Sequence, residues 1–161
     1  MYLTDEEILQ NFRTKGSEEY AFSHLVRKYQ EKLYSVIRRM VINHEDANDL
    51  TQEVFLKLWT NLGNFREHSK LFTWMYRIAV NESLNFIHSK KRRMIIPLVK
   101  IERKLEQKLE STNQYSGDEI HKKLQKALLR LPEKQRLVFN MRYYEEMPYE
   151  MMSEILGTSV G

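Results

Sequence analysis

The chain has 161 residues, of which 42% are apolar and 30% charged, with five glycines, three prolines and no cysteine. So few helix breakers favour a mostly helical protein, and the lack of cysteine excludes disulfides and thiolate metal sites. No apolar run approaches the roughly 20 residues that span a bilayer, and the N-terminus does not resemble a signal peptide. We therefore expect a cytoplasmic protein without membrane insertion, which carries a net charge of +4.

The N-terminal half is predicted to be helical. Thr4, followed by three acidic residues, is typical of a capped helix start. Apolar residues then recur at helical spacing, and Gly63 interrupts the pattern before a polar loop. Further helices are expected over residues 17–40, 45–61 and 71–92.

The helix expected at 45–61 has two unlike faces. At about 100° per residue, its apolar residues fall on one half of the cylinder: Ala47, Leu50, Val54, Phe55, Leu58, Trp59 and Leu62. The other half carries an acidic stripe of Asp46, Asp49 and Glu53, with Gln52 and Leu56 at its edge. A core face opposite an acidic strip beside an exposed leucine suits docking onto a basic protein surface.

The helix expected at 71–92 carries a polar stripe. Its members, three or four residues apart, are Trp74, Arg77, Asn81, Asn85, His88 and Arg92. The expected core side holds Leu71, Phe72, Met75, Ile78, Ala79, Phe86 and Ile87. Amides can pair with base edges and an aromatic ring can stack on an unpaired base. A core tryptophan and solvent-facing amides are the ordinary alternative, although two mid-helix Asn residues lower helix propensity.

Four consecutive cations, Lys90 to Arg93, end this helix. Such a cluster indicates phosphate binding, or simply a helix end where cations interact favourably with the dipole. Residues 94–117 then change character and are predicted to be a linker. Pro132, Pro148 and Gly157 delimit further helices in the last part of the chain. The expected fold is all-α, with two small helical domains at 1–93 and 118–161 joined by the linker.

Three ordered motifs resemble bacterial RNA polymerase sigma factors of the extracytoplasmic-function (ECF) class. Residues 46–59 (Asp-Ala-x-Asp-Leu-x-Gln-Glu-Val-Phe-x-x-x-Trp) are similar to the polymerase-docking helix of region 2. Residues 72–81 are similar to its promoter-melting, −10-reading segment, and residues 131–139 and 144–157 to region 4. The similarity covers about 20–93 and 120–161, and the lack of an intervening third domain points to the ECF class.

The resemblance implies a transcription initiation factor, not an enzyme, that needs no cofactor or metal. Its partners would be core RNA polymerase, promoter DNA and an anti-sigma factor. The residues meeting the clamp coiled coil of the polymerase β′ subunit would be Asp46, Asp49, Gln52, Glu53 and Leu56. Partly single-stranded promoter DNA would be bound by Asn64, Phe65, Arg66, Ser69, Trp74, Arg77, Asn81, Asn85, Lys90, Lys91, Arg92 and Arg93.

The sequence departs from the family at its end. Region 4 reads the −35 element with the second helix of a helix-turn-helix, whereas this sequence stops at Gly161, within the turn. The expected result is an incomplete helix-turn-helix, with −35 recognition reserved for a full-length protein. It also implies a loosened C-terminal unit in which Met152, Ile155 and Leu156 lack their packing partner.

Two other functions fit parts of the sequence. Asp46, Asp49 and Glu53 have a spacing that suits Mg²⁺ in a nuclease, but no other segment offers a matching carboxylate pair. A dimeric helix-turn-helix repressor would bind DNA through the C-terminal half. The zero net charge of residues 118–161 argues against that function.

Overall fold

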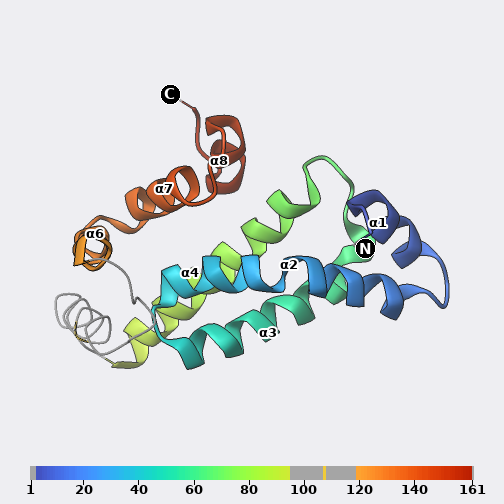
Figure 1. Ribbon diagram of the computed structural model, residues 1–161, viewed down its shortest axis with the longest axis horizontal. Coiled ribbons are helices and arrows are strands. Elements are labelled where there is room, and N and C mark those ends of the chain that lie inside the picture. Colours follow the sequence, from blue (N-terminus) through green and yellow to red (C-terminus); the bar gives the residue numbers. More distant parts are fainter. Residues whose placement is uncertain (1–2, 95–106, 108–118, 161) are drawn as a thin grey trace. The chain divides into compact units, whose positions relative to one another are not determined.

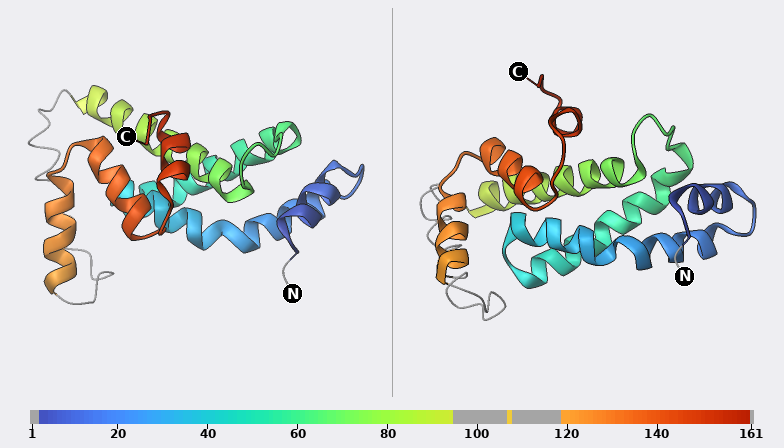
Figure 2. Two further views of the ribbon diagram at one scale, coloured as in Figure 1. Left: turned by 90° about the horizontal axis from the view of Figure 1, so that it is seen from above. Right: turned by 45° about the horizontal axis from the view of Figure 1, so that its top comes forward.

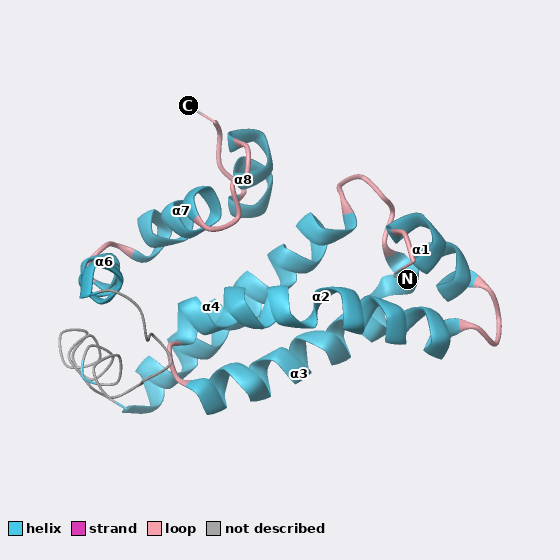
Figure 3. Ribbon diagram, in the orientation of Figure 1, coloured by secondary structure: helices cyan, strands magenta, loops and turns pink. Residues whose placement is uncertain are grey.

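The computed structural model describes residues 3–94, 107 and 119–160, with the side chains of 91–94 outside the description. The described residues form helices and connecting loops without any strand (Figure 3), as the all-α prediction requires. None of their helices is long and apolar enough to cross a membrane. The chain divides into two compact units, Met1–Ile87 and His88–Gly161. This division falls earlier than the predicted domain end at residue 93, and nearly all of the predicted linker lies outside the described residues.

The N-terminal unit is built around one long helix (Figure 1). Both α1 and α3 pack against α2, and the views in Figure 2 agree on this arrangement. The elements are α1 (Asp5–Arg13), α2 (Glu18–Val41), α3 (His44–Asn61), the 3₁₀ turn η1 (Leu62–Asn64) and the greater part of α4 (Leu71–Met94), whose last residues belong to the second unit. These bounds agree closely with the helices predicted from apolar spacing.

Local hydrogen bonds explain where α1 begins. The Thr4 side chain accepts from the Glu7 amide at 3.2 Å, and the Glu7 carboxylate accepts from the Thr4 amide at 2.7 Å. This reciprocal capping box satisfies two amides that a helix start leaves unpaired. Ile8 and Leu9 are buried against the rest of the unit. The predicted helix start is therefore confirmed, and its apolar side holds α1 in place.

A tight turn joins α2 to α3. Ile42 ends α2 with a φ of 64°, a left-handed conformation that costs a residue other than glycine about 1–2 kcal/mol. Burial of the Ile42 side chain, which is 4% exposed, offsets this cost. Asn43 then caps α3 by accepting from the Asp46 amide at 3.1 Å.

The buried face of α4 differs from the predicted one. Leu71, Met75 and Ala79 are buried as expected, but the other predicted core residues are only partly covered: Phe72, Ile78, Phe86 and Ile87. Among the described side chains of this helix, Thr73, Tyr76, Val80 and Ser83 are also buried. Polar residues are tolerated here because their groups can be satisfied locally; Ser83 Oγ donates to the Ala79 carbonyl at 2.8 Å.

The C-terminal unit comprises α6 (Glu119–Leu129), α7 (Glu133–Tyr143) and α8 (Tyr149–Leu156). Pro132 and Pro148 occupy the cap positions before α7 and α8, and Gly157 ends α8 with a φ of 63°. The expectation that Met152 and Ile155 lack packing partners is wrong, because both side chains are buried. They share the interior of the unit with Leu128, Leu129, Leu137, Met141 and Met147. Leu156 is partly exposed.

Candidate functional site

The predicted docking residues all lie on α3, turned away from the core. Ala47, Leu50, Val54 and Leu58 are buried on the opposite side of the helix. Asp49, Gln52 and Glu53 are exposed, and Asp46 is partly exposed. Leu56 stands among them with 68% of its surface exposed. The face thus combines carboxylates, an amide and an uncovered apolar side chain, a composition suited to a basic partner surface with an apolar centre.

Trp59 is less buried than the sequence pattern predicts. It is 36% exposed, and its ring lies edge-on to Phe12 at 5.3 Å and to Phe22 at 5.1 Å between ring centroids. Phe22 also contacts Phe55. The aromatic residues of α3 therefore fasten α1 and the start of α2 at the edge of the core.

A groove of about 530 Å³ lies between α2 and α3 at the surface. Gln52 connects this groove to the exposed face of α3. The other lining residues also carry polar groups and come from both helices: Gln30, Glu31, Tyr34, Ser35, Asn48 and Thr51. Sequence periodicity did not reveal these residues, because they become neighbours only when the two helices pack.

A second groove, of about 290 Å³, lies between α3 and α4. It brings together Asn64, Trp74 and Asn81, three of the residues predicted to bind DNA. Its other lining residues, which the sequence analysis missed, are Lys57, Asn61, Ile78 and Glu82. The groove therefore offers an aromatic ring, three amide groups and a Lys57–Glu82 ion pair of 2.6 Å in one small space.

The other predicted DNA residues with described side chains are not among the residues that line this groove. Arg66 and Asn85 are exposed, whereas Ser69, Arg77 and Lys90 are partly covered. Lys91, Arg92 and Arg93 continue the backbone of α4, and their side chains lie outside the described residues.

Phe65 has a structural position. Its ring is 6% exposed and packs on Trp74, with 5.1 Å between ring centroids. It therefore supports the tryptophan instead of presenting a free face for stacking. Two residues further, Glu67 has a φ of 57°, a left-handed conformation that requires support from its neighbours.

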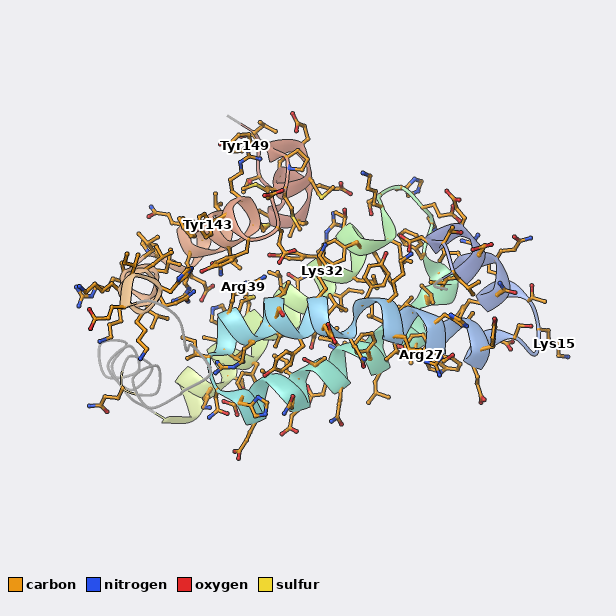
Figure 4. The ribbon with its side chains drawn as sticks, viewed as in Figure 1. Lys15, Arg27, Lys32, Arg39, Tyr143 and Tyr149 are labelled. Atoms are coloured by element: carbon orange, nitrogen blue, oxygen red, sulfur yellow. The ribbon has the colours of Figure 1, made fainter. Side chains whose placement is uncertain are left out.

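Two aromatic residues on the C-terminal unit were not singled out from the sequence. Tyr143 of α7 and Tyr149 of α8 are each more than half exposed (Figure 4). Phe139 stacks on Tyr143 at 5.1 Å, and the Arg142 guanidinium lies 5.4 Å from the Tyr149 ring. Within the described residues, no group of three or more His, Cys, Asp or Glu side chains is arranged to hold a metal ion.

Two regions of known sigma factors match this chain. Sigma-70 region 2 matches residues 25–93, and Sigma-70, region 4 matches residues 121–161. The RNA polymerase sigma-H factor of Pseudomonas aeruginosa is 31% identical over 165 residues, which span 98% of this chain and 84% of that protein. The ECF RNA polymerase sigma-E factor of Escherichia coli K12 is 29% identical over 167 residues, or 99% of this chain and 86% of that protein.

Solved structures show the same fold. CnrH in complex with the cytosolic domain of CnrY superposes with a TM-score of 0.67 at 19% identity, over 97% of this chain and 84% of that one. The sigma factor RpoE with the anti-sigma factor NepR from Bartonella quintana gives 0.66 at 21% identity, over 87% and 85%. An engineered region 2 of sigmaE in complex with GTAAAA gives 0.52 at 35% identity, over 58% and 96%.

The chain belongs to the sigma-70 family of RNA polymerase sigma factors, in its ECF class. It is a transcription initiation factor that directs RNA polymerase to promoters.

Proposed function

We propose that the α3–α4 groove holds an unpaired base of the opened −10 promoter element. The observation that supports this proposal is the convergence of Asn64, Trp74 and Asn81 on one groove. A ring that stacks on a base contributes about 1–3 kcal/mol, and an Asn amide can pair with both N6 and N7 of adenine. Extruding a base costs a few kcal/mol, so the cost and the return nearly cancel. Polymerase binding would then decide whether the promoter opens.

The exposed face of α3 is the proposed docking surface for the β′ clamp coiled coil of core polymerase. Its carboxylates would orient a basic partner and speed encounter, whereas Leu56 would contribute affinity once water is excluded. An anti-sigma factor is a proposed second partner, because one similar sigma factor was solved with such a protein. The proposed place of action is the cytoplasm.

Two measurements test these proposals. The first is the affinity of the chain for single-stranded GTAAAA, the sequence bound by the similar region 2, compared with a strand of the same bases in scrambled order. A preference for GTAAAA is expected, and equal affinity for both strands would refute the base-reading groove. The second is a pull-down with core polymerase followed by transcription from a bubble template. A chain that neither binds the polymerase nor supports initiation would refute the docking surface.

A further inference from the structure

The loop between η1 and α4, residues 65–70, is bound by a side chain of α1. Arg13, the last residue of α1, donates from Nη2 to the Phe65 carbonyl at 3.0 Å. Its Nη1 lies 2.7 Å from a carboxylate oxygen of Glu67. One guanidinium therefore holds two points of a loop that is 52 residues away in sequence. Figure 1 shows this loop passing beside α1.

Both held points are places where the loop needs support. The Phe65 amide donates to the Leu62 carbonyl at 3.2 Å, so bonds on either side fix the backbone of Phe65. Its ring in turn packs on Trp74, which lines the α3–α4 groove. Glu67 has the left-handed backbone conformation, and the ion pair with Arg13 favours it. The position of Trp74 is thus linked to Arg13 through Phe65.

The helix that carries Arg13 is itself firmly anchored. Asp5 accepts from Lys28 and Tyr29 of α2, each at 2.7 Å. Phe12 packs on Phe22 and Trp59. These contacts make α1 a fixed support for the loop. The segment lies before residue 25, where the match to Sigma-70 region 2 begins.

We propose that Arg13 is a positioning residue that sets base selectivity by fastening the loop at 64–69 beneath Trp74. The inference rests on the proposed base-reading groove. Arg13 would act without touching DNA, since its two outer nitrogens already hold the Phe65 carbonyl and Glu67. A lysine cannot replace it fully, because an ammonium lacks the planar fork that spans two acceptors.

The decisive variant is the double substitution Arg13→Ala with Glu67→Ala, which leaves the net charge of the loop region unchanged. We expect its preference for GTAAAA over a singly mismatched strand to fall about 5-fold or more, the lower end of what one base stack supplies. Glu67→Ala alone retains the bond to Phe65 and should keep most of the preference. Arg13→Lys should recover part of it. Lys15→Ala controls for the loss of a cation near the end of α1, because Lys15 is exposed at the α1–α2 turn and points outward in Figure 4.

A second readout does not depend on DNA. In a Trp59→Phe background Trp74 is the remaining tryptophan, and its quenching by acrylamide should rise when Arg13 is replaced, since Phe65 then moves off its ring. Salt dependence separates positioning from direct contact. Loss of one phosphate contact on a single strand reduces the slope of log affinity against log salt concentration by about 0.7. The double variant should keep the slope of the parent protein.

Each outcome decides between the possibilities. Unchanged Trp74 quenching, or a slope reduced by about 0.7, would overturn the positioning role. Increased quenching with undiminished base preference would show that the fastened loop does not set selectivity, and the proposal would again be overturned. If the parent protein itself prefers no sequence while quenching responds to Arg13, the base-reading function fails and the selectivity role fails with it.

Discussion

The Tyr29 hydroxyl lies 2.7 and 2.9 Å from the two carboxylate oxygens of Asp5 and donates its hydrogen to that group. Lys28 donates to the same carboxylate and to the Leu3 carbonyl, at 2.7 and 3.1 Å. The Tyr29 ring also stacks on Phe72, with 5.8 Å between centroids. One side chain of α2 therefore joins α1 and α4, the two helices that carry Arg13 and Trp74.

Tyr29→Phe should destabilise the N-terminal unit. The substitution keeps the ring and removes one hydrogen bond to a partly buried carboxylate, so the free energy of unfolding should fall by about 1–2 kcal/mol. Urea denaturation followed by circular dichroism measures the change. Tyr20→Phe is the matched control, because Tyr20 is 55% exposed and should tolerate the same change. Equal losses from the two substitutions would contradict the role assigned to the Asp5 bond.

The free energy of unfolding should fall at alkaline pH because of the ionisation of Tyr29. Burial, followed by the hydrogen bond to Asp5 and its negative charge, raises the pKa of Tyr29 far above its usual value. In the unfolded chain the phenol titrates near 10, so above that pH the unfolded state loses a proton that the folded state retains. This contribution is complete below about pH 10 and is lost as the pH rises further. The unfolding free energy of Tyr29→Phe should therefore vary less than that of the parent between about pH 9 and 11.

Reversing two charges on α3 should prevent polymerase binding without unfolding the chain. Asp49→Arg with Glu53→Arg places cations opposite a basic partner, and both side chains are exposed. Pull-down with core polymerase should lose the complex, while the circular dichroism spectrum stays unchanged. Glu6→Arg with Glu19→Arg changes the net charge equally at exposed positions elsewhere. Normal holoenzyme assembly by the α3 variant would refute the docking surface.

Asn81→Ala should relax recognition at a single base. If the amide pairs with both N6 and N7 of an adenine, its loss costs about 1–3 kcal/mol at that position and little elsewhere. Affinities for GTAAAA strands substituted one base at a time identify the position. Asn11→Ala, an amide on α1, is the control substitution. A uniform loss across all strands would mean that Asn81 reads no base.

Replacing the cations from Lys90 to Arg93 with alanine should weaken every sequence alike. Phosphate contacts carry no base information, and each one released from a single strand reduces the slope of log affinity against log salt by about 0.7. Titrations at several salt concentrations, with cognate and scrambled strands, provide the measurement. An altered preference between the strands at an unchanged slope would argue against phosphate binding by this cluster.

The helices were predictable because their determinants are local. The Thr4–Glu7 capping box spans one turn, and Gly157 ends α8 through its own backbone freedom. The acidic stripe of α3 follows directly from helical periodicity. The polar stripe of α4 correctly placed Trp74 and Asn81 on one side, since both line the same groove.

Tertiary contacts account for what the sequence did not predict. The bond from Arg13 to Phe65 joins segments 52 residues apart, and no local pattern indicates it. Hydropathy ranks serine as polar, so the burial of Ser83 was not predicted. Ser83 can be buried because its hydroxyl donates to a carbonyl of its own helix. Phe65 was expected at the DNA, but its exposed loop sequence gave no indication that Trp74 would cover the ring.

The exposure of Leu56 bears on how many partners this protein can bind at once. With 68% of its surface uncovered, this side chain is the apolar centre of the proposed docking surface, and two proteins could not cover it at once. If the proposed docking surface binds RNA polymerase, any second protein that covers Leu56 would compete with the polymerase for this factor. The number of initiating complexes would then follow the relative abundance of the two competitors, without any change in the shape of the factor itself.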